Sequence, residues 1–283
     1  MSLAAVKGTG KHGRVTKEDV LNFVESGGKP TAPRATTKQE APIAAKTDKV
    51  IKLTGRWKEL ARNMTDSLVI PHDNIMDFVD MTSIKRAMKT FMEMYPKKQI
   101  DLMPFAMKAL SCALLDYPLA NALTGTNKGK DGIATEYVEK AEHNMGIVID
   151  TPEGPLVPNI KSVQRKSILQ INEELRELME RVSKSTLTQS DLSGSTFTLC
   201  HINCISGFPR IYTPQTTILG LGKQLVIPGY ITVKGATKMV PKEVFTLNLT
   251  CDHRIIDGAT SVKFINQIKQ YLEQLELLIM RLK

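Results

Sequence analysis

A strand-like segment followed by a histidine, a turn and a helix start constrains the fold of this chain more than any other feature. Residues 244–251 read Val-Phe-Thr-Leu-Asn-Leu-Thr-Cys, an alternation that predicts a β-strand with its odd-numbered residues on one face. If this strand continues, His253 has the same parity and faces the protein interior. Asp257 and Gly258 then predict a turn that leads into a helix.

His253 has two interpretations at this point. Imidazole groups titrate near neutral pH, so a covered histidine can remove a proton as a general base. The alternative is a core histidine whose ring is satisfied by a backbone carbonyl. In that case Asp257 and Gly258 serve only as a turn and a helix cap.

The size and composition indicate one large globular domain with a small appendage. The chain has 283 residues, of which 42% are hydrophobic, and this supplies enough apolar surface for a sizeable core. We expect no membrane segment, because no uninterrupted apolar run reaches the roughly 18 residues that a spanning helix needs.

The four cysteines occur in apolar or strand-like contexts, which is typical of a protein from a reducing compartment. They are Cys112, Cys200, Cys204 and Cys251. A zinc site stays open as an alternative, because Cys200, Cys204, Cys251 and His253 could supply four ligands from two neighbouring strands. These spacings are weak metal signals, and we predict no metal.

The positive charge is diffuse rather than concentrated. The first 50 residues carry a charge of 9 − 5 = +4, and the remaining 233 carry the other +5 of the total of +9. No basic stripe with interleaved aromatic residues is present, so we expect no nucleic-acid partner. Diffuse positive charge would, however, favour the phosphates of an anionic cofactor.

Composition divides the chain into three predicted parts. Residues 1–26 are compatible with a small helical domain. Residues 27–49 form a tract rich in Pro, Ala, Thr and Lys, which predicts a flexible linker. Residues 50–283 form the large domain.

The first part contains a capped helix and a glycine-rich loop. Thr16 and Asp19 predict the start of a short helix that runs through Phe23. Residues 8–13 match the pattern G-x-G-x-x-G, but no strand precedes them, so a phosphate-binding loop has little support.

Periodicity within the large domain predicts alternating strands and helices. Strands are expected at residues 145–150, 156–160, 196–202, 217–221 and 244–251. Helices are expected at residues 102–115, 167–182 and about 259–280. These elements predict an α/β sandwich with helices on one face of a mixed sheet.

Several motifs carry a resemblance to a known family. The pattern His-x-x-x-Asp-Gly at residues 253–258 resembles the signature of the dihydrolipoamide acyltransferases and chloramphenicol acetyltransferase. Residues 143–159 resemble the family's central hairpin, and residues 191–199 resemble the entry to its next strand. The Ile-Pro-His sequence at residues 70–72 fits as well. Within that family, the motifs of this chain most resemble those of the acyltransferase core of the branched-chain 2-oxo acid dehydrogenase complex.

The resemblance implies a fold, a reaction and an assembly. The expected fold is the chloramphenicol acetyltransferase-like sandwich. The chains are expected to form trimers with active sites between subunits, and the trimers are expected to assemble into a larger shell. The implied reaction moves an acyl group, isobutyryl above acetyl, between a dihydrolipoyl thiol and the thiol of coenzyme A. His253 would be the general base, and Asp257 would anchor the turn of the histidine.

Other positions match the family or depart from it. Asp150 and Gly222 match its coenzyme A site. Cys200 and the following His201 stand where the family has a Ser-Asn pair, whose hydroxyl stabilises the oxyanion. A thiol is a weak hydrogen-bond donor, and losing an oxyanion donor costs about 10²- to 10³-fold in rate. Asp101 replaces a serine beside the coenzyme A phosphates.

These departures leave two alternatives open. Met88 also replaces an arginine expected in the coenzyme A site, so the chain could be a weakened or inactive relative that serves as a structural core subunit. A different enzyme would use Cys200 as a nucleophile activated by His253, as a thioester hydrolase or a ping-pong transferase.

The resemblance also sets expectations for partners and location. Residues 6–20 resemble the second half of a peripheral subunit-binding domain, so the chain looks truncated at its start. The lipoyl group would come in trans or from a missing N-terminal domain. Expected partners are the 2-oxo acid decarboxylase and dihydrolipoamide dehydrogenase components. The location would be the mitochondrial matrix in a eukaryote and the cytoplasm in a bacterium.

Overall fold

The computed structural model describes residues 6–27, 48–96, 98–125, 127, 135–233 and 235–281. The chain separates into two compact units, Met1–Ile51 and Lys52–Lys283, and each is described by itself. Most of the expected linker, residues 27–49, lies outside the described residues, so the linker stays a prediction. Within the described ranges, no helix is both long enough and apolar enough to cross a membrane.

The first unit is built around one capped helix, as expected. Helix α1 spans Lys17–Glu25 and follows the short 3-10 turn η2, Lys11–Gly13. Thr16 and Asp19 form a reciprocal capping box, which confirms the predicted helix start. Asp19 also accepts hydrogen bonds from the backbone and hydroxyl of Thr9, at 3.0 and 2.6 Å. The backbone hydrogen bond from Thr16, followed by the two bonds from Thr9, lowers the pKa of the Asp19 carboxyl.

The second unit contains a seven-stranded mixed sheet. The strands are β1 His72–Asp80, β4 Met145–Val148, β5 Asn159–Ile160, β6 Phe197–His201, β7 Thr217–Leu221, β8 Leu225–Val233 and β9 Ala236–Asp252. Their order is β1-β9-β7-β6-β4-β5, and β8 pairs with the first half of β9. Strands β4, β6 and β7 are parallel, whereas β9 is antiparallel to β1 and β7. The five predicted strands are all present, in part with shorter bounds.

Helices and a small second sheet complete this unit. The helices are α2 Gly55–Ser67, α3 Thr82–Met94, α4 Leu102–Asp116, α5 Ile168–Ser183, α6 Gln189–Leu192, α7 Gly258–Glu273 and α8 Leu275–Met280. The 3-10 turns η3 Pro118–Asn121 and η4 Val163–Arg165 and the strand pair β2 Ala122–Thr124 and β3 Tyr137–Glu139 connect them. The helix predicted at residues 259–280 is therefore two helices, which meet at Gln274.

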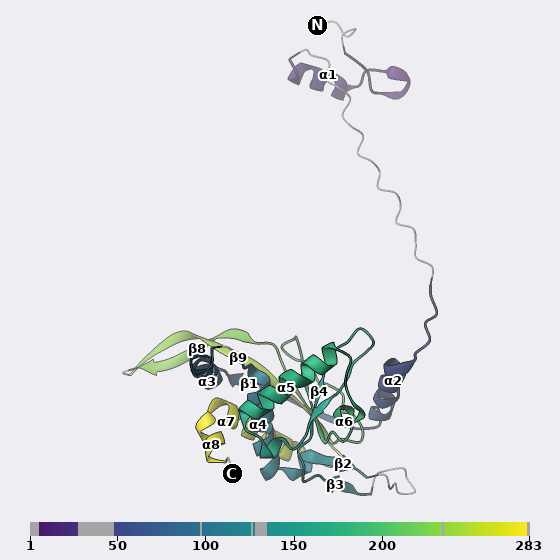
Figure 1. Ribbon diagram of the computed structural model, residues 1–283. Helices are drawn as coiled ribbons and strands as arrows, with labels where there is room; N and C mark the ends of the chain where they lie inside the picture. The colour runs from purple at the N-terminus through teal and green to yellow at the C-terminus, as the bar shows by residue number, and fades with distance from the viewer. Residues whose placement is uncertain are drawn as a thin grey trace. The chain divides into compact units, whose positions relative to one another are not determined.

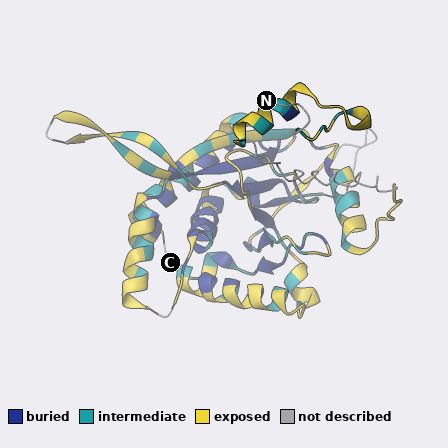
Figure 2. Cartoon of the chain, turned by 90° about the horizontal axis from the view of Figure 1, so that it is seen from above, coloured by how far each residue is buried: buried dark blue, intermediate teal, exposed yellow. Residues whose placement is uncertain are grey.

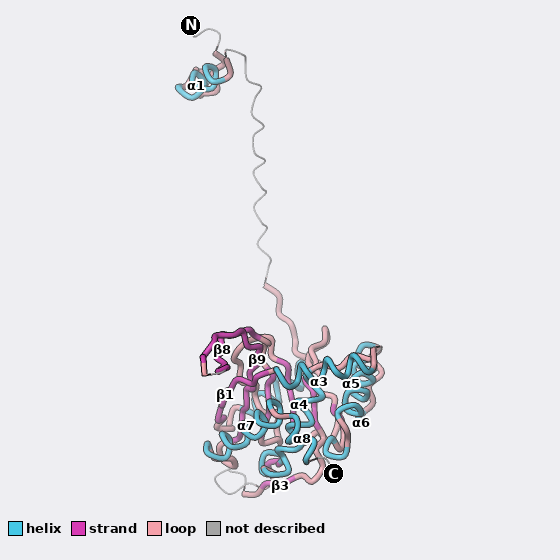
Figure 3. Tube along the Cα trace, turned by 90° about the vertical axis from the view of Figure 1, so that its left-hand side faces the viewer, coloured by secondary structure: helices cyan, strands magenta, loops and turns pink. Residues whose placement is uncertain are grey.

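One face of the sheet packs against α4, α5 and α7 (Figure 1). Helix α4 is buried almost all round, which explains its nearly uniform apolar sequence. The odd-numbered residues of β9 from Phe245 to Cys251 join this core, as the alternation predicted. Figure 3 shows the strands gathered beside these helices.

The other face of the sheet is buried as well, and it combines polar side chains with a small apolar cluster around Cys200 and Ile218. Thr198 donates to Gln215 Oε1 at 2.7 Å, and Thr246 donates to the backbone carbonyl of Ile205 at 2.6 Å. The central strands are consequently buried on both sides, whereas the β8–β9 hairpin is largely exposed (Figure 2).

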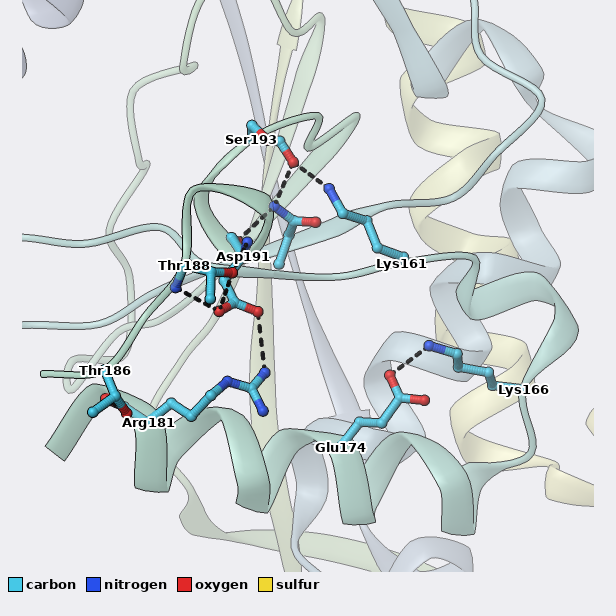
Figure 4. A network of polar contacts seen from close by, with 9 residues as sticks. Lys161, Lys166, Glu174, Arg181, Thr186, Thr188, Asp191 and Ser193 are labelled. Atoms are coloured by element: carbon cyan, nitrogen blue, oxygen red, sulfur yellow. Dashed lines mark hydrogen bonds and ion pairs between the residues drawn. The ribbon is translucent and has the colours of Figure 1, made fainter. Parts of the chain in front are cut away.

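The loop before β6 is held by a compact polar network (Figure 4). Asp191 accepts hydrogen bonds from the Thr188 backbone at 2.8 Å and from Arg181 at 3.1 Å. Asn159 on β5 donates to the carbonyls of Asp191 and Ser193 at 2.9 and 3.0 Å. These contacts fix the start of β6, and therefore the position of the residues at its far end.

Candidate active site

His253 lies on a turn at the end of β9 and not inside the protein. The strand ends at Asp252, one residue earlier than the predicted parity requires, and residues 253–255 form a turn. The side chain of His253 is exposed in the single chain. Its backbone N–H donates to the carbonyl of Pro71 at 2.9 Å, which ties the turn to the segment before β1. The inward orientation expected for His253 was therefore wrong.

An ion pair with a buried carboxylate brackets His253. The carboxylate of Asp252 is fully buried, and Arg254 binds it through Nε at 2.9 Å, Nη2 at 2.6 Å and its backbone N–H at 3.0 Å. A bidentate guanidinium–carboxylate pair defines direction as well as distance. The two neighbours of His253 thus fix its backbone. Neither Asp252 nor Arg254 was predicted to have a role, although the two opposite charges that flank His253 in the sequence were a usable signal.

Asp257 caps the helix that follows. It is the N-cap of α7, and its side chain accepts hydrogen bonds from the backbone of Thr260 at 3.0 Å and from the Thr260 hydroxyl at 2.7 Å. The hydroxyl bond and then the backbone bond lower the pKa of the Asp257 carboxyl. Both of its oxygens are engaged by Thr260, so the geometry fits a positional role.

Cys200 is a buried apolar side chain on β6. It packs with Ile70, Ile211 and Ile218, and this burial raises the pKa of its thiol to about 12. A thiol with such a pKa is protonated at neutral pH and is a poor nucleophile. Among the residues that the structure describes, no group of three or more His, Cys, Asp or Glu could hold a metal, so the zinc alternative gains no support.

Strand register separates Cys200 from His253 within one chain. Cys200 is paired with Gly220, which is paired with Asn248 on β9. Asp252 lies four residues further along β9, roughly 13 Å, and the two strand spacings add about 10 Å across the sheet. The separation is therefore roughly 16 Å or more. His253 of the same chain cannot activate Cys200.

A cavity of about 730 Å³ opens at the ends of β4, β6 and β7. Asp150 and His201 line it, together with Leu221, and the first residues of α4 and residues 172–179 of α5 complete the wall. The structure thus brings Asp150 and His201 together. His201 received no role of its own in the sequence reasoning, although its position after Cys200 placed it at a strand end.

Gly222 follows directly after this wall and is required by packing. A Cβ atom there would collide with Thr246 Oγ1 and would lie 3.0 Å from the carbonyl oxygen of Cys204. Its backbone N–H also donates to the Thr246 carbonyl at 2.8 Å. The residue gives the chain room to turn beside the cavity.

Two models of protein families match the chain. The model described as 2-oxoacid dehydrogenases acyltransferase (catalytic domain) matches residues 45–280, and the model described as e3 binding domain matches residues 1–21. The chain belongs to the 2-oxoacid dehydrogenase acyltransferase family. This confirms the resemblance inferred from the sequence motifs.

Similar curated proteins include eukaryotic and bacterial family members. The mitochondrial lipoamide acyltransferase component of the branched-chain alpha-keto acid dehydrogenase complex of Caenorhabditis elegans is 34% identical over 300 residues, which cover all of this chain. The acetyltransferase component of the Staphylococcus aureus pyruvate dehydrogenase complex is 34% identical over 301 residues, 99% of this chain and 67% of its own. The chain spans 64% of the length of the C. elegans relative.

Solved structures confirm the predicted fold. A probable dihydrolipoamide acetyltransferase from Listeria monocytogenes aligns with a TM-score of 0.69 at 28% identity, over 80% of this chain and 95% of its own. The cubic core of a pyruvate dehydrogenase multienzyme complex aligns with a TM-score of 0.73 at 24% identity, over 86% and 99%. The α/β sandwich is therefore that of the family's catalytic domain.

Proposed function

We propose that this chain is an acyltransferase that moves an acyl group between a dihydrolipoyl thiol and the thiol of coenzyme A. The observation that carries the proposal is the fixed position of His253 between the buried Asp252 and its ion-pair partner Arg254, in a chain of this family. The name of the C. elegans relative favours a branched-chain acyl group such as isobutyryl, with acetyl second.

In the proposed reaction His253 acts on the attacking thiol. The neutral imidazole accepts the thiol proton while the sulfur attacks the thioester carbonyl, which gives a tetrahedral oxyanion. Collapse of this intermediate breaks the original carbon–sulfur bond, and the departing thiolate takes the proton back from the imidazolium. No oxidant or further reactant is needed. Asp257 fixes the start of α7 and thereby the turn that carries the histidine.

We infer that two copies of the chain share each active site. His253 is exposed and does not line the cavity at the β-strand ends. A second copy could place its own His253 at this cavity, in the trimer expected for the family. The cubic core described for the related pyruvate dehydrogenase complex suggests that such trimers assemble further.

Partners and location follow from the relatives as part of the proposal. The match to the e3 binding domain model at residues 1–21 supports an interaction with dihydrolipoamide dehydrogenase, and the complex would also contain a 2-oxo acid decarboxylase. The lipoyl group would be supplied in trans or by a further domain. The C. elegans relative is mitochondrial, which supports the matrix for a eukaryotic protein and the cytoplasm for a bacterial one.

A second function has one observation in its favour. Cys200 is buried among isoleucines and replaces the serine hydroxyl that the resemblance implies for the oxyanion. A chain that lacks this donor could still assemble, so a structural core subunit of the complex is the alternative.

The deciding experiment is isobutyryl transfer from isobutyryl-coenzyme A to free dihydrolipoamide. We compare the protein with His253→Ala and with His12→Ala, a control in the first unit. The proposal requires a rate that His253→Ala abolishes and His12→Ala leaves intact. If the unmodified protein transfers isobutyryl no faster than His253→Ala does, the structural core subunit is supported instead.

A further inference from the structure

The cavity at the ends of β4, β6 and β7 has an apolar wall. Methionine, leucine and isoleucine side chains supply most of it, including Met92, Met103, Met179, Ile149 and Leu221. Asn172 and Gln224 add neutral hydrogen-bonding groups. Such a lining suits a flexible arm of methylene and amide groups, because the apolar side chains cover the methylenes and the amides find polar partners.

The charged residues of the cavity do not suit phosphates. Two negatively charged residues, Asp101 and Asp150, line the cavity, and Arg176 is the only lysine or arginine among the described residues that line it. The formal sum is 1 − 2 = −1 with His201 neutral, although the whole chain carries +9. The local charge is thus opposite in sign to that of the whole molecule.

Asp101 also occupies the N-terminus of helix α4, whose free backbone N–H groups are the part of the cavity best able to bind a phosphate. It is the N-cap of the 15-residue helix α4, and its carboxylate accepts a hydrogen bond from the Met103 backbone at 3.0 Å. A helix N-terminus attracts anions through its free N–H groups and its dipole. Here the protein's own carboxylate takes that place, so a phosphate would lose the amide and meet a like charge.

We propose that this cavity accepts the uncharged thiol arm of the acyl carrier, a pantetheine-like chain, and gives no binding advantage to the nucleotide phosphates of coenzyme A. The inference rests on the proposed acyltransferase function and specifies its substrate class. Acyl thioesters of pantetheine are then used about as well as those of coenzyme A. The carrier in the cell is a thiol on a methylene and amide arm, with its charge kept outside the cavity.

The test compares kcat/KM for isobutyryl-pantetheine and isobutyryl-coenzyme A with dihydrolipoamide as acceptor. We expect the two values to agree within about threefold. Asp101→Asn keeps a good helix cap and removes the charge, and it should raise the ratio of the coenzyme A value to the pantetheine value about fivefold. Glu139→Gln, an exposed carboxylate on β3 outside the cavity, should leave the ratio unchanged.

The outcomes separate this inference from the proposed function. The inference is overturned if kcat/KM for isobutyryl-coenzyme A exceeds that for isobutyryl-pantetheine by 100-fold or more and Asp101→Asn does not change this ratio. The acyltransferase function would still stand in that case. If neither thioester reacts, the proposed function fails. Calorimetric titration with pantetheine and with coenzyme A then tests the cavity without turnover. Equal affinities support the inference, and tighter binding of coenzyme A, or no binding of pantetheine at millimolar concentration, overturns it.

Discussion

Replacing Arg254 by alanine should destabilise the protein strongly, because it leaves a carboxylate buried without its cation. Asp252 has no exposed surface, and Arg254 supplies three hydrogen bonds, of which only the backbone bond survives the substitution. Removing one partner of a buried pair costs about 3–5 kcal/mol. The Arg254 side chain is 28% exposed, so water can reach the vacated space, and we expect a loss of about 3 kcal/mol.

Arg281 provides a matched control. It binds Asp116 with two hydrogen bonds of 2.9 Å, the same two-point geometry, but the two side chains are 45% and 31% exposed. Arg281→Ala should therefore cost about 1 kcal/mol or less. Urea unfolding of both variants at one protein concentration measures the difference.

A third variant separates charge from packing. Asp252→Asn combined with Arg254→Ala removes the buried charge and should recover part of the stability lost by Arg254→Ala alone. Equal losses for Arg254→Ala and Arg281→Ala would refute the reasoning, since burial is the only intended difference between the pairs. We also expect Arg254→Ala to lose most of its acyl-transfer rate, because the backbone of His253 is no longer held.

Two further predictions concern buried polar groups. Thr217 Oγ1 is buried, faces only the weak sulfur acceptor of Cys251 and has no other partner among the described residues. Thr217→Val should therefore raise the free energy of unfolding by about 1 kcal/mol. Thr198→Val removes the hydrogen bond to Gln215 and should lower the free energy of unfolding by about 1–2 kcal/mol. Urea unfolding measures both variants, and the opposite order of stability would contradict this reasoning. Burial lowers the pKa of His143 from 6.5 to about 4. The unfolded chain therefore binds the extra proton first, so stability is complete above pH 6.5 and falls by roughly 3 kcal/mol toward pH 4. His143→Gln should flatten that slope in pH-dependent melts.

Local patterns predicted the central strands and the helices α4, α5 and α7 of the large domain, but not α2, α3, α6, β2 or β3. Helices α4 and α5 and strand β7 lie within one or two residues of the expected bounds, because burial on one or all sides leaves a clear apolar period. Strands β1 and β8 were not predicted. Both lie at the margin of the sheet and alternate less clearly in sequence, and their pairing with β9 over a long separation defines them.

The sequence proposed residues for the candidate site but not their arrangement in space. The sequence motifs selected His253, Asp257 and Asp150, whose roles stay predictions, and they could not indicate that β9 stops at Asp252. That end depends on Arg254 turning back to a buried carboxylate, a tertiary preference that overrides the alternation. The distance between Cys200 and His253 depends on strand register across three strands, which no local pattern contains.

Strand β9 divides its pairing between two regions of the molecule. Its first half pairs only with β8, whereas its second half lies between β1 and β7 and leads directly to His253. A one-residue slip in the second half would exchange buried leucines for polar residues, so two neighbouring ladders lock that half. Insertions or deletions near the hairpin turn would alter only the β8 ladder. The length and chemistry of this hairpin can therefore change without moving the histidine at the other end of the strand.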